Sequence, residues 1–213
     1  MKVLGENMKI IMLGPQGSGK GTHAKFLAEG LNVPHLSTGE ILRKTPRDSP
    51  LGKQVFELID KGVLVPDELI AKIVNERLKS AEFSKGFILD GFPRNIHQAK
   101  MLEVAPDHVL YLDISDKEAM KRLSGRWQCR KCEAIYGPDA PPKKKGICDK
   151  CGGELYQRDD DKPEAIAKRL RIFHTETEPL KDFYKEQGLL RVVKGQKEID
   201  DTFKAILKVL KLE

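Results

Sequence analysis

The chain has 213 residues, a formal net charge of +6 and 33% charged residues, and its basic residues are mixed with acidic ones. No apolar stretch approaches the roughly twenty residues that span a bilayer, and no signal-peptide pattern opens the sequence. These features argue against a membrane protein and do not demand a nucleic-acid partner. We expect a cytoplasmic protein with one large α/β domain or a core with insertions.

Short apolar runs alternate with longer helical patterns along the chain. The predicted strands cover residues 9–13, 34–36, 86–89, 108–112 and 189–193. The predicted helices cover residues 19–29, 39–44, 51–61, 67–80, 96–103, 117–126, 163–187 and 199–210. Strands that alternate with helices predict a parallel sheet covered on both faces, which binds ligands at the carboxyl ends of its strands.

A glycine-rich turn, GPQGSGK over residues 14–20, joins the first predicted strand to the first predicted helix. The backbone N–H groups of such a turn, the helix N-terminus and Lys20 all favour bound anions at one place, so the turn predicts a polyphosphate site. Gly21 stands where such loops usually carry a magnesium-binding Ser or Thr, and Thr22 follows. We therefore expect Mg²⁺ to be held mainly by phosphates and waters.

A second loop, DGFPR over residues 90–94, follows the predicted strand 86–89. Asp90 could hold Mg²⁺ through water, as acidic residues at the end of a neighbouring strand do in phosphate-loop enzymes. The alternative interpretation is that Asp90 caps a helix. Gly91 would let a ligand approach the backbone closely.

All four cysteines lie in a segment that interrupts the α/β pattern, as Cys129-x2-Cys132 and Cys148-x2-Cys151. This spacing predicts a structural zinc site with a closed shell of four thiolates. Disulfides or unrelated free thiols are the alternatives, and a cytosolic location argues against disulfides. The run at residues 143–145 raises the alternative of a nucleic-acid-binding zinc ribbon, but nearby acidic residues nearly cancel its charge, so we expect a solvated turn.

Arginines recur where phosphates are expected to bind. Arg43 and Arg94 follow strand ends, Arg122 and Arg126 are four residues apart on a predicted helix, and Arg158 and Arg169 flank the end of the cysteine segment. Phosphoryl transfer requires positive charge around the migrating group and exclusion of water. The arrangement therefore favours a nucleotide enzyme over a simple nucleotide-binding protein.

The helix predicted at 163–187 has a recognisable start. Asp161 is a candidate cap, and Pro163 and Glu164 suit the first turn. Ile166, Leu170 and Phe173 share one face and are expected to point inward.

Together these motifs resemble the adenylate kinase family, of the type with a long, zinc-binding lid. The likeness extends over nearly the whole chain from Met8, and the family's phosphate loop also carries Gly-Thr after the lysine. It implies a P-loop NTPase-like fold, an α/β architecture with a five-stranded parallel sheet flanked by helices. The implied core covers residues 1–37, 67–125 and 162–213, with a monophosphate-binding insertion at 38–66 and a lid at 126–161.

The resemblance also implies roles for individual residues. Those that match ATP-binding positions are Gly17, Ser18, Gly19, Lys20, Gly21, Thr22, Arg122, Arg126, Ile135, Tyr136 and Lys197. Those that match AMP-binding positions are Thr38, Arg43, Val63, Leu64, Val65, Gly91, Phe92, Pro93, Arg94, Gln98, Arg158 and Arg169. Gln98 matches the glutamine that reads the adenine edge. The implied catalytic set is Lys20, Arg94, Arg126, Arg158 and Arg169.

The implied reaction is ATP + AMP ⇌ 2 ADP, with Mg²⁺ accompanying ATP and Zn²⁺ in the lid. The acceptor is already an anionic phosphate oxygen, so no general base is required, and packing or surface roles are expected for the five histidines. A UMP/CMP-type kinase is the nearest alternative, although Thr38 and Gln98 favour adenine. A nucleotide-sensing protein and a zinc-ribbon nucleic-acid binder are the non-enzyme alternatives. We expect a monomer.

Overall fold

The computed structural model describes residues 7–60 and 65–212. Its main sheet contains β1 (Lys9–Leu13), β2 (His35–Ser37), β3 (Phe87–Asp90), β4 (His108–Asp113) and β8 (Leu190–Lys194). All pairings in this sheet are parallel, and the order is β2-β3-β1-β4-β8. The predicted five-stranded parallel sheet is confirmed, and each predicted strand lies within one residue of the observed one at either end.

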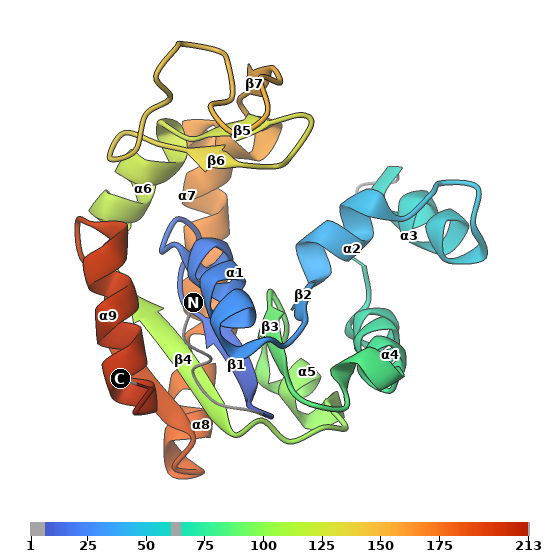
Figure 1. The fold of residues 1–213 in the computed structure, drawn as a ribbon. Helices are drawn as coiled ribbons and strands as arrows, with labels where there is room; N and C mark the ends of the chain where they lie inside the picture. Colours follow the sequence, from blue (N-terminus) through green and yellow to red (C-terminus); the bar gives the residue numbers. More distant parts are fainter. Residues whose placement is uncertain (1–6, 61–64, 213) are drawn as a thin grey trace.

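Helices connect these strands and flank the sheet (Figure 1). They are α1 (Lys20–Leu31), α2 (Thr38–Lys44), α3 (Pro50–Asp60), α4 (Asp67–Leu78), α5 (Ile96–Met101), α6 (Asp116–Ser124), α7 (Pro163–Ile172), α8 (Leu180–Glu186) and α9 (Ile199–Leu210). A short 3₁₀ turn covers Ala81–Phe83 and another covers Asp159–Asp161. Among the described residues, no helix is both long and apolar enough to cross a membrane.

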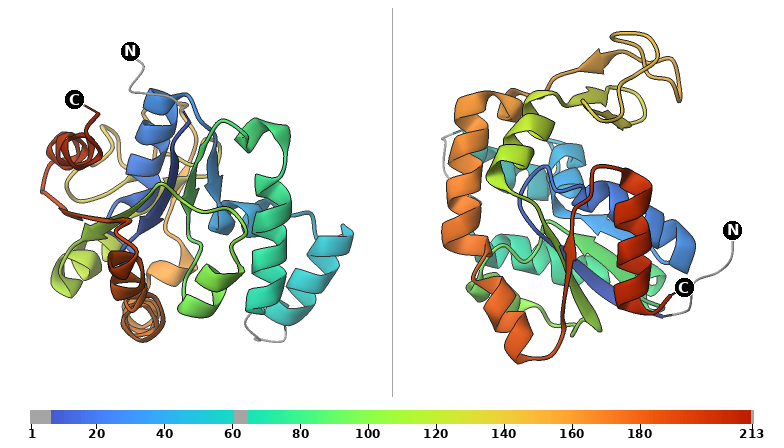
Figure 2. Two further views of the ribbon diagram at one scale, coloured as in Figure 1. Left: turned by 90° about the horizontal axis from the view of Figure 1, so that it is seen from below. Right: turned by 90° about the vertical axis from the view of Figure 1, so that its left-hand side faces the viewer.

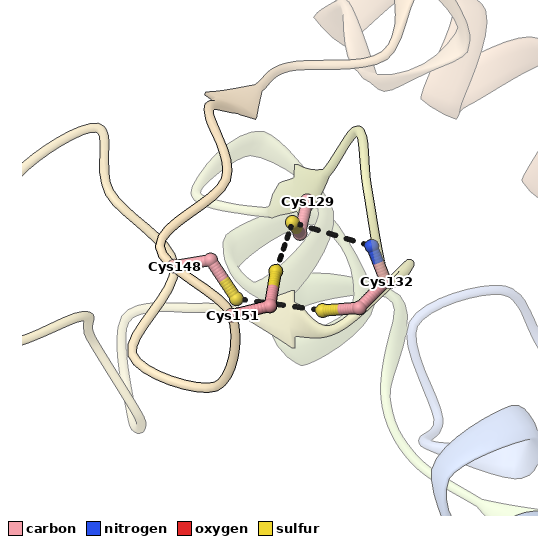
Figure 3. Close-up of side chains that lie close together, drawn as sticks. All are labelled: Cys129, Cys132, Cys148 and Cys151. Atoms are coloured by element: carbon pink, nitrogen blue, oxygen red, sulfur yellow. Dashed lines mark hydrogen bonds between the residues drawn. The ribbon is translucent and has the colours of Figure 1, made fainter.

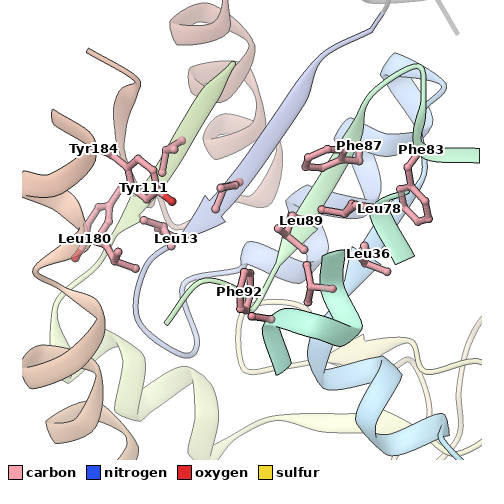
Figure 4. Close-up of a cluster of buried hydrophobic side chains, with 14 of the residues drawn as sticks. Leu13, Leu36, Leu78, Phe83, Phe87, Leu89, Phe92, Tyr111, Leu180 and Tyr184 are labelled. Carbon is pink, nitrogen blue, oxygen red and sulfur yellow. The ribbon is translucent and has the colours of Figure 1, made fainter. Parts of the chain in front are cut away.

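Successive residues of a strand point to opposite faces of the sheet, and different helices cover the two faces. Ile10 and Met12 of β1 pack with residues of α1 and α9 on one face. Ile11 and Leu13 belong to the other face, where they pack with buried side chains of α4 and α8 and with Phe87 of β3 (Figure 4). Burial on both faces explains why the central strands are continuous apolar runs.

Two segments project from this core (Figures 1 and 2). One contains α2 and α3. The other is a small antiparallel sheet of β5 (Trp127–Cys129), β6 (Ile135–Tyr136) and β7 (Leu155–Tyr156), in the order β6-β5-β7. The second segment joins the core through α6 and α7, which pack together through Ala119, Leu123, Ile166 and Leu170.

The helix predicted at 163–187 is not continuous. After α7, residues Phe173–Thr177 form a π-helical turn, in which the N–H of Glu178 donates to the carbonyl of Phe173 at 2.8 Å, and α8 begins after Pro179. Proline has no N–H to donate and its ring crowds the preceding turn, so it ends a regular α-helix. The inward stripe is confirmed, because Ile166, Leu170 and Phe173 are buried.

A second correction concerns the helix predicted at 117–126. It ends at Ser124, so Arg126 lies in the connection to β5 and does not share a helical face with Arg122. Gly125 is the C-cap of α6.

Candidate active site

The glycine-rich turn curls between β1 and α1, as predicted. Gly14, Gly17 and Gly19 have φ angles of 135°, 83° and 92°, which L side chains rarely adopt. A Cβ on Gly14 would lie 2.4 Å from the carbonyl oxygen of Leu112 on β4, so the loop must approach that strand closely. No side chain caps the N-terminus of α1, so its positive end and first N–H groups face the loop.

Lys20 is the first residue of α1 and lies beneath this loop. Its ammonium group donates to the carbonyl oxygens of Gly14 at 2.6 Å and Pro15 at 2.8 Å. Burial lowers the pKa of Lys20 to about 8, an effect that the nearby Asp90 carboxylate opposes and that Arg94, Arg169 and Arg126 reinforce. The charges that act on Lys20 come from the end of β3, from the root of the small sheet and from α7. The structure therefore gathers these cations around the phosphate loop.

Asp160 and Asp161 hold three of the predicted arginines in place. Arg158 donates two hydrogen bonds to the Asp160 carboxylate, at 2.8 and 2.7 Å, and Arg169 lies 3.1 Å from the same carboxylate. Arg126 donates two hydrogen bonds to Asp161, at 2.8 and 2.6 Å. Opposite charges at these distances keep the guanidinium groups together despite their mutual repulsion.

Asp161 is therefore not the cap of the helix that follows. The N-cap of α7 is Lys162, and no side chain donates or accepts a capping hydrogen bond there. The Asp161 carboxylate is taken up by Arg126 and by Arg169, 3.5 Å away. Pro163 and Glu164 do occupy the first turn of α7.

The DGFPR loop stands beside the phosphate loop. A Cβ on Gly21 would lie 3.4 Å from the Asp90 carboxylate, so Asp90 faces α1, and it caps no helix, since the N-cap of α5 is Asn95. Gly91 has a φ of 86°, and a Cβ there would approach the Thr38 hydroxyl to 2.6 Å. Arg94 donates from Nε to the Gly91 carbonyl at 2.9 Å.

The structure describes most of the residues that are predicted to bind AMP. Thr38 lines an apolar hollow between α2 and α4, together with Ile41, Leu42, Ile70, Ile73 and Val74. Phe92 and Pro93 are buried, and Val65 is half-buried. Gln98 is buried, and its side chain is hydrogen-bonded to the backbone N–H of Arg94 and to Asp67 at the start of α4. Val63, Leu64 and the side chain of Arg43 lie outside the described residues.

A cleft of about 670 Å³ opens beside α6, where β4 and β8 end. Arg122 and Lys197 line it, as do Glu118 and Gln196. Arg122 donates from Nε to Glu118 at 2.6 Å and from Nη2 to the carbonyl of Gln196 at 2.9 Å. Arg122 and Lys197, both predicted to bind ATP, thus lie in one cleft although 75 positions separate them in the sequence (197 − 122).

The predicted pair Ile135 and Tyr136 divides between two faces of the small sheet. Ile135 is 50% exposed. Tyr136 is buried among the cysteines, where its hydroxyl accepts from the N–H of Asp149 at 2.8 Å and lies 3.4 Å from the sulfur of Cys148. In this arrangement Ile135 presents an apolar surface to solvent, and Tyr136 supports the cysteines.

The four cysteines converge although the first cysteines of the two pairs are 19 positions apart (148 − 129) (Figure 3). Their sulfur atoms all lie within 4.8 Å of one another, and Cys129 accepts from the N–H groups of Lys131 and Cys132 at 3.4 and 3.5 Å. The pKa of the Cys148 thiol is lowered to about 6, mainly by its hydrogen bond with the Tyr136 hydroxyl. Four convergent sulfurs, with N–H and O–H donors around them, suit a thiophilic metal ion.

The parallel sheet, its glycine-rich loop at the N-terminus of α1 and the surrounding cations define a phosphate-loop nucleotide enzyme. Residues 12–189 match the family model described as adenylate kinase. An adenylate kinase of Caldicellulosiruptor bescii is 47% identical, with 97% of this chain and 100% of the relative aligned. One of Archaeoglobus fulgidus is 46% identical, with 95% and 98% aligned. The chain belongs to the adenylate kinase family.

Some residues of the site carried no signal in the sequence. Asp161 was expected to cap a helix, and nothing in its spacing from Arg126, 35 positions away, indicates that they pair. Asp139 lies in the small sheet segment yet comes within 3.3 Å of Lys121 and 3.8 Å of Arg122 on α6. Asp67 contacts Gln98 across 31 positions. Such contacts depend on how helices and loops pack.

Proposed function

We propose that this chain transfers a phosphoryl group reversibly from ATP to AMP, giving two ADP. Membership of the adenylate kinase family supports the reaction. The structural observation that carries the proposal is that Arg94, Arg126 and Arg169 all lie close enough to the half-buried Lys20 at the glycine loop to lower its pKa. Asp90, Asp160 and Asp161 offset part of this positive charge, and a bound polyphosphate would offset more of it.

We assign roles to the residues from the resemblance to the family and, where the structure describes them, from their positions. The loop amides of Gly17 to Thr22 and the Lys20 ammonium hold the donor phosphates, and Arg122, Ile135 and Lys197 border the rest of the donor. Thr38, Arg43, residues 63–65, Gln98 and the loop from Gly91 to Arg94 receive AMP. Arg126, Arg158 and Arg169 surround the migrating group and stabilise its equatorial oxygens. Tyr136 acts through the cysteines rather than on ATP, because its side chain is buried there.

The residues also fit Mg²⁺ bound with ATP. The Asp90 carboxylate faces Gly21 at the phosphate loop, so it can accept hydrogen bonds from waters around a phosphate-bound cation. The ion supplies positive charge to the phosphate oxygens. Thr22, one position later than the usual ligand, is not assigned to it.

We infer three units in the chain, a core (1–37, 67–125 and 162–213), an AMP-binding unit (38–66) and a lid (126–161). The projection of the two insertions from the core supports this division (Figure 1). Substrates would enter an open site and react after the lid closes and excludes water. Arg126 and the acidic pair Asp160 and Asp161 lie where the lid joins the core.

We infer that Cys129, Cys132, Cys148 and Cys151 hold a structural Zn²⁺. The convergence of four sulfurs supports this, since four thiolates complete a tetrahedral shell and leave no position for substrate. Elemental analysis should find close to one zinc per chain. Cys132→Ser should lower the thermal midpoint more than the turnover number. Metal-free native protein would overturn the assignment.

One assay tests the reaction. The rate of ADP formation from ATP is measured with AMP, CMP and UMP as acceptors, and AMP should give the highest kcat/KM. A preference for CMP or UMP would assign the chain to the pyrimidine type, and no transfer to any acceptor would leave a nucleotide-sensing or nucleic-acid-binding role. We expect the protein to act in the cytoplasm as a monomer, without a nucleic-acid partner.

A further inference from the structure

Both ends of the Gln98 amide are held by neighbours. Gln98 is only 5% exposed, its Oε1 accepts from the backbone N–H of Arg94 at 2.8 Å, and its Nε2 donates to Oδ1 of Asp67 at 2.5 Å. A backbone N–H can only donate, and an ionised carboxylate can only accept. The two partners therefore allow one orientation of the amide and exclude the flipped one.

Asp67 is itself fixed. Its Oδ2 accepts from Nδ2 of Asn95 at 2.7 Å, and Oδ1 of Asn95 accepts from the backbone N–H of Gln98 at 2.8 Å, as the N-cap of α5. Asp67 is also the first residue of α4, where the helix dipole favours a negative charge. The Asp67 carboxylate thus links the first turn of α4 to the first turn of α5. One of its oxygens accepts from the Asn95 amide and the other from the Gln98 amide.

We propose that Asp67 is a positioning residue that selects the acceptor base, an inference that rests on the proposed function because that function places Gln98 at the base of AMP. The Gln98 Nε2 carries two hydrogens. Asp67 takes one of them, and in the described part of the chain no group accepts the other. That second hydrogen is available to a hydrogen-bond acceptor on the base, and the fixed amide cannot turn its oxygen there instead.

The consequence is discrimination at one atom of the purine ring. N1 of adenine is a hydrogen-bond acceptor and can receive the Gln98 hydrogen. N1 of hypoxanthine carries a hydrogen of its own, so IMP would place two donors face to face. A site whose donor cannot rotate away rejects such a base more strongly than one whose amide is free to flip.

The test compares AMP and IMP as acceptors in the same enzyme preparation, with the wild type, Asp67→Ala and the matched control Glu68→Ala. Glu68 is the next carboxylate of α4, but it is exposed and contacts His97, not Gln98. Because both acceptors are measured on one preparation, any loss of folded protein cancels in the ratio of their kcat/KM values. Thermal midpoints are recorded alongside.

In Asp67→Ala the AMP-to-IMP ratio of kcat/KM should fall about tenfold, as expected for losing a hydrogen bond to a charged group. KM for AMP should rise while kcat at saturating AMP changes little, and Glu68→Ala should keep the wild-type ratio. An unchanged ratio in Asp67→Ala would overturn the inference while leaving the proposed function intact. A wild type that does not phosphorylate AMP would overturn the proposed function instead.

Discussion

Arg126 and Asp161 form an ion pair between the two chain segments that enter and leave the lid. Two hydrogen bonds join them, at 2.8 and 2.6 Å, and the Asp161 side chain is 0% exposed. Arg126 precedes β5 and Asp161 precedes α7, so the pair closes the base of the whole insertion. Electrostatic attraction between Arg126 and Asp161 therefore holds together the two ends of the inserted segment.

Asp161→Asn should lower the free energy of unfolding by about 3 kcal/mol, because it leaves Arg126 without its buried counter-charge. Urea denaturation measures the change. Asp159→Asn is the control, since the Asp159 side chain is 103% exposed and its contact with Lys162 is 3.8 Å long. Equal stability losses in the two variants would show that the buried pair has no special weight.

Arg94→Ala should lower kcat by about 10² or more, in keeping with the loss of one preorganised charge donor. Arg94 lies close enough to Lys20 to lower its pKa. A coupled ADP assay at saturating substrates measures the effect. Arg191→Ala serves for comparison, because Arg191 donates to the carbonyls of Gly188 and Leu190 at the start of β8. A near-normal rate in Arg94→Ala would remove Arg94 from the site.

Tyr136→Phe should speed the release of Zn²⁺ to a chelator by about tenfold or more, the range typical of lost outer-shell hydrogen bonds. The Tyr136 hydroxyl accepts from the N–H of Asp149, so its own hydrogen is directed to the Cys148 sulfur. Tyr156→Phe is the matched control, because that hydroxyl lies against Gln128 in the same small sheet. Identical release rates in both variants would contradict a supporting role for Tyr136.

His23 should make the protein less stable as the pH falls from about 6.5 towards 4. Burial, reinforced by Arg122, lowers the pKa of His23 to about 4, and the ring is 3% exposed between Phe26 and Phe203. In this range His23 binds a proton in the unfolded chain but not in the folded protein. The free energy of unfolding is therefore highest above the unfolded pKa of His23 and falls as the pH is lowered.

The comparison variant is His23→Gln, which cannot titrate. Between pH 7 and pH 4.5 the wild type should lose about 2 kcal/mol more of unfolding free energy than this variant. Denaturant titrations at the two pH values supply the measurement. Parallel curves for the two proteins would mean that His23 is protonated as readily in the folded state as in the unfolded one.

Local patterns were sufficient for the sheet and for the phosphate loop. Apolar runs of the right length predicted β1 and β4, and the glycines of residues 14–19 predicted a turn with positive φ because few other residues adopt it. The sequence signal failed where two local patterns competed. The apolar stripe of α7 continues towards α8, but Pro179 interrupts the helix with a π-helical turn between them.

The sequence alone determined which chemical groups the protein has and the order in which it presents them. It indicated the anion-binding turn, the four thiols and the supply of guanidinium groups, because each depends on residue type and short spacing. Only the tertiary structure decided which charges pair. Asp161 binds Arg126 instead of capping α7, and Asp67 orients Gln98, since both contacts arise from the packing of segments 31 to 35 positions apart. Electrostatic and hydrogen-bond energies depend on distance in space, which local spacing does not encode.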